Sequence, residues 1–65
     1  MPTYRVYHVG SDGRLTVGET FSASADAQAV TRARAQLRPA RAAELWAGGR
    51  LVGRFSKTHE FTAGG

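Results

Sequence analysis

Two glycine-containing pairs constrain the fold of this chain more than any other feature. They are Asp12-Gly13 and Gly48-Gly49, and each lies between two stretches of strand-forming sequence. A pair of this kind between alternating β-branched and aromatic residues is typical of a β-hairpin with a tight turn. The sequence therefore predicts two hairpins, built from residues 3–9 with 14–23 and 41–47 with 50–55.

One helix is predicted between the hairpins, over residues 24–37, SADAQAVTRARAQL. Ser24 suits the N-cap, Asp26 suits the positive end of the helix dipole, and Pro39 ends the helix. The predicted apolar stripe consists of Ala29, Val30, Ala33 and Leu37. Small residues on this stripe allow the helix to pack closely against a sheet.

These elements predict an α+β fold: ββαββ, one four-stranded, mainly antiparallel sheet with a single helix on one face. Residues 1–55 form the single domain, and residues 56–65 form a tail. The tail is interpreted as a short extra strand, a segment lent to a partner, or a disordered end. Strand orders 2-1-3-4 and 2-1-4-3 both satisfy the two hairpins.

A two-residue turn at Asp12-Gly13 predicts which side chains of the first hairpin share a face. His8 then pairs with Val17, and Tyr4 pairs with Phe21. The predicted core face carries Tyr4, Val6, His8, Leu15, Val17 and Phe21. The opposite face carries Thr3, Arg5, Tyr7, Val9, Arg14, Thr16 and Thr20. Glu19 interrupts the core face, and Gly18 beside it indicates a β-bulge.

Two registers compete in the second hairpin. A two-residue turn at Gly48-Gly49 gives two mixed faces, whereas a three-residue loop, residues 47–49 with a bulge at Gly49, separates them. The second register is favoured. It predicts a core face with Ala43, Leu45, Leu51, Gly53 and Phe55, and an open face with Glu44, Trp46, Arg50, Val52 and Arg54. In the first register Trp46 is buried instead.

The small size of the chain favours association. Its 65 residues contain no cysteine, so a single small core must hold the fold without a disulfide. Nine basic and five acidic residues give a net charge of +4, which suits an anionic partner but is also ordinary for a solvated surface. No stretch is long and apolar enough to cross a membrane, and no secretory leader is recognisable, so a cytoplasmic location is expected.

No catalytic or metal-binding pattern is present. His8 and His59 lie in distant segments, no serine lies in a nucleophile turn, and no glycine-rich phosphate loop opens the helix. We therefore expect no enzyme activity, no metal and no cofactor. The expected function is a small interaction module that forms a homodimer or binds a protein partner through the open sheet face or a sheet edge. The candidate binding residues are Arg5, Tyr7, Arg14, Trp46, Arg50 and Arg54. The alternative is single-stranded nucleic acid, with bases stacked on Tyr7 and Trp46.

Two resemblances accompany these expectations. The stretches YRVYHVGSDGRL and ELWAGGRLVGRF, with the alanine-spaced helix between them, resemble a group of short bacterial proteins without an established activity. That resemblance covers residues 4–55 and implies the same fold. The terminal Gly64 and Gly65 are similar to the end of the β-grasp sulfur carriers, in which the last glycine carboxylate carries sulfur. This second resemblance implies a last strand beside the first one, leading into the diglycine.

Overall fold

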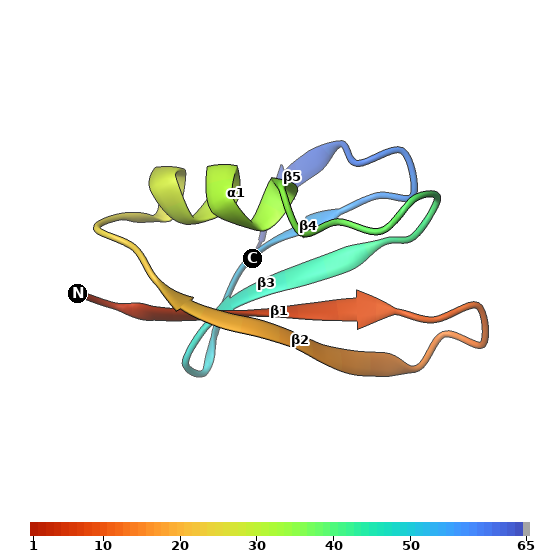
Figure 1. Ribbon diagram of the computed structural model, residues 1–65, viewed down its shortest axis with the longest axis horizontal. Coiled ribbons are helices and arrows are strands. Elements are labelled where there is room, and N and C mark those ends of the chain that lie inside the picture. Colours follow the sequence, from red (N-terminus) through yellow and green to blue (C-terminus); the bar gives the residue numbers. More distant parts are fainter. Residues whose placement is uncertain (65) are drawn as a thin grey trace.

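The computed structural model describes residues 1–64 and contains one helix packed on a five-stranded antiparallel sheet (Figure 1). The strands lie in the order β2-β1-β3-β4-β5. In chain order the elements are β1 Thr3–Val9, β2 Leu15–Ser22, α1 Asp26–Arg34, β3 Ala43–Ala47, β4 Arg50–Phe55 and β5 Phe61–Ala63. The α+β class is confirmed, and the first four strands follow the order 2-1-3-4. The four-stranded count is wrong, because residues 61–63 of the tail add a fifth strand.

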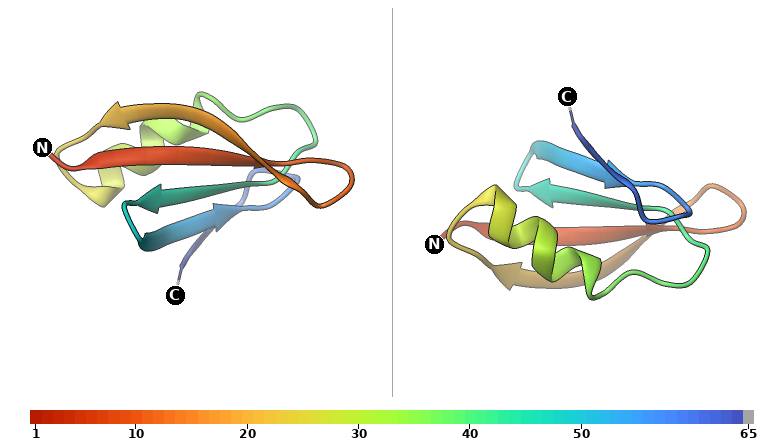
Figure 2. Two further views of the ribbon diagram at one scale, coloured as in Figure 1. Left: turned by 90° about the horizontal axis from the view of Figure 1, so that it is seen from below. Right: turned by 90° about the horizontal axis from the view of Figure 1, so that it is seen from above.

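Helix α1 covers one face of the sheet and leaves the other uncovered (Figure 2). Its buried residues, Ala29 and Ala33, are small, which brings the helix axis close to the strands. The helix is shorter than predicted at both ends. Ser24 provides no side-chain cap; its backbone N–H and hydroxyl both donate to the side-chain oxygen of Gln28, at 2.7 and 3.0 Å.

The core lies between α1 and the sheet. It contains Tyr4, Val6, Ala23, Ala29, Ala33, Ala43, Leu45, Val52 and Phe55, with His8 as the buried polar residue. The predicted inward positions of β1 are confirmed, because alternate residues of this strand, Tyr4, Val6 and His8, are all buried.

The β1–β2 turn has three residues instead of the predicted two. The N–H of Gly13 donates to the carbonyl of Gly10, and Gly13 takes a φ of 82°, as in a type I turn followed by a G1 bulge. His8 therefore pairs with Thr16 and not with Val17. The pairing of Tyr4 with Phe21 is nevertheless as predicted, since the β-bulge expected at Gly18 restores the register further along.

The longer turn moves Leu15 and Val17 to the uncovered face. Leu15 pairs with Val9, and Val17 pairs with Tyr7. Both therefore lie on the same face as Val9 and Tyr7, which alternate along β1 with its buried residues. Their assignment to the core was wrong. Arg14 and Thr16, predicted on the uncovered face, alternate with them and fall on the opposite side.

The β3–β4 hairpin has the two-residue turn, which was the less favoured of the two registers predicted from the sequence. Ala47 pairs with Arg50, and only Gly48 of the glycine pair has a positive φ, 59°, as a type II′ turn requires. The predicted bulge at Gly49 is absent. A bulge lies instead at Val52, between the pairs Leu45–Gly53 and Trp46–Leu51.

The two-residue turn exchanges the predicted faces of the start of β4, and the bulge at Val52 restores them from Gly53 onward. Arg50 and Val52 lie on the helix side, and Val52 is buried, whereas Leu51 shares the uncovered face with Trp46. Trp46 itself pairs with Arg5 and lies on the uncovered face as predicted. The position of the indole therefore does not require a bulge after Ala47, because its neighbour Leu45 fills the core.

Strand β5 pairs with β4 at the far edge of the sheet. Its Phe61 ring packs against Phe55 with the ring centroids 5.0 Å apart, and the N–H of Gly64 donates to the carbonyl of Val52 at 2.8 Å. The neighbours of β1 are β2 and β3. The described part of the chain therefore lacks the last strand beside the first that the sulfur-carrier resemblance implies; Gly65 lies outside the described residues.

Candidate functional site

The uncovered sheet face is the candidate functional site, and we call it the open face. Strand pairing assigns its members from four strands, because paired residues of neighbouring strands project to the same side. They are Arg5, Tyr7 and Val9 of β1, Leu15 and Val17 of β2, Glu44 and Trp46 of β3, and Leu51 and Arg54 of β4. The left view of Figure 2 is taken from this side, with α1 behind the sheet.

The open face is apolar over β2, a strand at the edge of the sheet, and over the neighbouring rings of β1 and β3. Leu15 and Val17 are 51% and 59% exposed; Val17 pairs with Tyr7, and Leu15 lines a hollow with the half-buried rings of Tyr7 and Trp46. A shallow hollow between the strands is lined by Tyr7, Leu15, Trp46 and Gly48. Large aliphatic side chains left in water next to aromatic rings are typical of a surface that another molecule covers.

The Trp46 indole is oriented by a carboxylate. Its Nε1–H donates to Oε1 of Glu44 at 3.1 Å, and the Nε–H of Arg54 donates to Oε2 of the same residue at 3.2 Å. The Glu44 side chain is only 17% exposed, so both of its oxygens are satisfied under the neighbouring side chains. The charge of Arg54 is thereby compensated on the face itself.

Arg5 lies on the inner strand β1, where it pairs with Thr20 of β2 and Trp46 of β3. Its Nε–H donates to the Thr20 hydroxyl at 3.1 Å across the β1–β2 pair. A hollow of about 240 Å³ opens there, lined by both strands together with Tyr7 and Trp46. Among the described residues, Arg5 is the one base of the open face without an ion pair.

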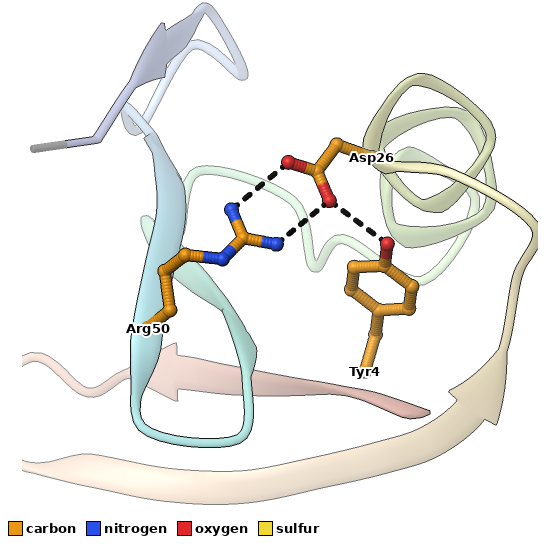
Figure 3. Close-up of polar contacts among 3 residues, drawn as sticks. All are labelled: Tyr4, Asp26 and Arg50. Atoms are coloured by element: carbon orange, nitrogen blue, oxygen red, sulfur yellow. Dashed lines mark hydrogen bonds and ion pairs between the residues drawn. The ribbon is translucent and has the colours of Figure 1, made fainter. Parts of the chain in front are cut away.

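Two of the predicted binding residues lie elsewhere. Arg14 lies at the tip of the β1–β2 turn, 3.7 Å from Asp12. Arg50 lies on the helix side, where its Nη1–H and Nη2–H donate to the two carboxylate oxygens of Asp26 at 2.9 and 3.0 Å (Figure 3). The open face is therefore less basic than the sequence indicated, with Arg5, Tyr7, Trp46 and Arg54 remaining of the six.

The Asp26 carboxylate joins three elements. Besides Arg50 of β4 it accepts the Tyr4 hydroxyl of β1 at 2.8 Å, as Figure 3 shows. The hydrogen bonds from Arg50 and then Tyr4 lower the pKa of Asp26, and the hydrogen bond to Asp26 raises the pKa of Tyr4. This arrangement fixes the first turn of α1 over the sheet, because each member comes from a different element. Its partners lie 22 and 24 positions from Asp26 along the chain, so spacing gave no signal for it.

A second polar position lies under the end of the helix. His8 is 6% exposed, and its Nδ1 has no hydrogen-bond partner within residues 1–64. Burial, and then the charge of Arg38, lowers the pKa of the His8 imidazole. A Cβ at Gly18 would lie 2.8 Å from His8 Nε2, so the bulge glycine is required for the ring to fit. Sequence alternation placed His8 correctly but could not show its missing partner.

Neither a family model, nor a curated protein, nor a solved structure matches this chain. Within residues 1–64 no cluster of three side chains suited to holding a metal ion is found. The same part of the chain has no helix of the length and hydropathy that a membrane span needs. Function is therefore argued from the geometry of the open face and from the distribution of charge.

Proposed function

We propose that this protein is a non-catalytic interaction module that forms a homodimer through the open face. The observation that carries the proposal is the position of Leu15 and Val17, which are half exposed on β2 beside Tyr7 and Trp46. A two-fold axis through this face would place the same apolar side chains on both sides of the interface. Each copy would then cover the side chains that the other leaves in water.

The size of the face suits a dimer. The backbone spans 33 × 21 × 19 Å, and the open face is seen along the intermediate axis. Its outline of 33 × 19 Å therefore covers roughly 600 Å² before side chains are included, close to the ~800 Å² that each partner buries in a standard interface. A second copy of the same sheet would cover it almost completely.

The charges of the face are compatible with a second copy. Arg54 is paired with Glu44, so the face carries one uncompensated base, Arg5, on the inner strand β1. Like charges brought together inside an interface would oppose association. Here the Arg5 side chain is exposed and long enough to turn its guanidinium toward solvent, where water and salt screen the charge.

Association would also stabilise the fold. A chain of 65 residues without a disulfide buries a small core, which here includes three alanines of the helix side, Ala23, Ala29 and Ala33. Covering Leu15, Val17 and the two rings would add apolar burial at about 25 cal/mol per Å² before the costs of association. Stability is therefore expected to rise with protein concentration.

The test is sedimentation equilibrium over a concentration series, with a matched pair of variants. Val17→Lys introduces a charge on the apolar part of the open face, whereas Thr16→Lys introduces the same charge on the adjacent exposed position of the opposite side. The wild-type protein and Thr16→Lys are expected to dimerise, and Val17→Lys is expected to remain monomeric. Quenching of Trp46 fluorescence by acrylamide should fall with concentration in the first two proteins only.

Two results would overturn the proposal. One is a wild-type protein that stays monomeric up to its solubility limit. The other is equal dissociation in both lysine variants, which would show that added charge acts without regard to the face. Circular dichroism of each variant establishes that it is folded, as expected for substitutions at exposed positions.

A further inference from the structure

The net charge of the chain resides mainly away from the open face. Three ion pairs, Arg14–Asp12, Arg50–Asp26 and Arg54–Glu44, compensate three bases and three of the five acids. Of the six other Lys and Arg side chains in the sequence, four occur in the last turn of α1 and in two loops: Arg34, Arg38, Arg41 and Lys57. We call these four residues, with His59, the basic end.

Backbone and side-chain contacts hold the basic end together. Arg34 donates from Nη1 to the carbonyl of His59 at 2.6 Å, and His59 donates from Nε2 to the carbonyl of Arg38 at 2.9 Å. The Arg41 N–H in turn donates to that same carbonyl at 3.2 Å. The loop of residues 35–42 and the loop of residues 56–60 therefore lie side by side beyond the end of the helix, as Figures 1 and 2 show.

The same two loops contain the non-glycine residues with a positive φ. These are Ala40, with a φ of 57°, and His59, with a φ of 67°, among the described residues. Such conformations are uncommon for side-chain-bearing residues, and they concentrate at sites of function. Here they turn both loops so that Arg38 and Lys57 are displayed while the two loops remain hydrogen-bonded through His59.

The two acids without an ion pair within residues 1–64, Glu60 and Glu19, both lie near these bases, so four positive charges are opposed by two negative ones. Glu60 shares the second loop, and its carboxylate accepts the Thr58 hydroxyl at 3.5 Å. Glu19 borders a neighbouring hollow of about 450 Å³ that Arg38 also lines. The guanidinium of Arg34 lies 5.2 Å over the Phe55 ring and is held in place, whereas those of Arg38 and Arg41 have no side-chain bond within residues 1–64 and can turn toward a ligand.

We propose that the basic end binds the phosphate backbone of a nucleic acid without reading its sequence. Guanidinium groups suit phosphate oxygens, and a group of four neighbouring positive charges suits a polymer with a regular series of negative ones. A membrane surface fits less well: Val17 borders this end, since it lines the same hollow as Arg38, but one exposed apolar side chain is less than a membrane-inserting surface needs. The rings of Phe55 and Phe61 pack into the core and are not available for base stacking.

The experiment measures the anisotropy of a fluorescent 20-nucleotide single strand as a function of salt. Four phosphate contacts predict a slope of about −2.8 for log affinity against log salt, hence a roughly 50-fold loss of affinity between 50 and 200 mM salt. Arg38→Gln should reduce the slope to about −2.1, and Arg38→Gln with Arg41→Gln should reduce it to about −1.4. Arg14→Gln removes the same charge from the β1–β2 turn, where Asp12 compensates it, and should leave the wild-type slope unchanged.

Three results would overturn the proposal. The first is no binding by the wild-type protein at 50 mM salt. The second is an equal effect of Arg14→Gln and Arg38→Gln, which would assign binding to net charge alone. The third is equal affinity, at the same salt, for poly-glutamate or for vesicles containing phosphatidylserine, which would assign the basic end to another class of partner. The binding of the monomeric Val17→Lys variant separates this proposal from dimerisation, since its basic end is intact.

Discussion

Gly53 offers a sharp test of how β5 is attached. This glycine lies on β4 opposite Leu45 and Ala63, and the ring of Phe61 lies directly over it. A Cβ at this position would lie 2.2 Å from Phe61 Cζ and 2.6 Å from the carbonyl oxygen of Thr62. Neither distance is tolerable, so in Gly53→Ala either the aromatic ring and β5 move away or the β4 backbone does.

The structure can respond to the added methyl group in two ways, and the response that loses less free energy of unfolding sets the effect. Forcing one additional carbon into a packed site costs about 1–3 kcal/mol. Releasing β5 instead exposes the half-buried Phe61, of which full burial is worth about 1.5–3 kcal/mol. We therefore expect Gly53→Ala to lose about 2 kcal/mol, which lowers Tm by roughly 8–16 °C for a domain of this size.

Thermal unfolding followed by circular dichroism measures the change, and Gly49→Ala is the matched control. No atom lies within 4 Å of the position that a methyl group would take at Gly49, and this residue has no positive φ, so its substitution should leave Tm nearly unchanged. Adding Phe61→Ala to Gly53→Ala should cost less than the sum of the two single changes, because the ring is then no longer displaced. A Gly53→Ala protein as stable as Gly49→Ala would refute the close approach of β5.

Three other perturbations follow from the contacts. Asp26→Asn should lower Tm at neutral pH, and the difference in Tm from wild type should shrink at pH 3. The hydrogen bond from Arg50 lowers the pKa of Asp26, so the stability that the ionised carboxylate provides is lost as pH falls through that lowered pKa. In urea titrations the wild type should lose stability below pH 6.5, because burial and Arg38 lower the pKa of His8 and protonation then disfavours the folded state. His8→Gln should flatten this loss, and equal slopes for both proteins would contradict the reasoning. Gly13→Ala should cost about 1 kcal/mol in the same titrations, since its φ of 82° is strained for alanine; an unchanged midpoint would exclude that strain.

Part of the candidate site followed from the sequence, and part could not. Alternation along β1 identified Arg5 and Tyr7 as outward-facing, because their neighbours Tyr4 and Val6 are buried. The face of Leu15 was wrong because an Asp-Gly pair fits both a two-residue turn and a three-residue turn with a bulge, and the two differ by one position in register. The assumption that apolar residues are buried in the core led to the same wrong assignment, because an apolar side chain on a partner-binding surface produces the same sequence pattern.

The sequence by itself determined the order of the first five elements, β1 to β4 with α1 between the hairpins, the inward residues of β1, and the bulge at Gly18, because these depend on local backbone preference and on alternation within one segment. Tertiary structure decided the bulge at Val52, the attachment of β5, and the pairing of Arg50 with Asp26. Each of these depends on contacts between segments distant along the chain, where a difference of one residue in pairing reverses the face of a side chain. The distribution of charge could not be predicted from the sequence for the same reason. Composition shows a net charge of +4, but only the fold shows which arginines pair with acids and which lie in the basic end.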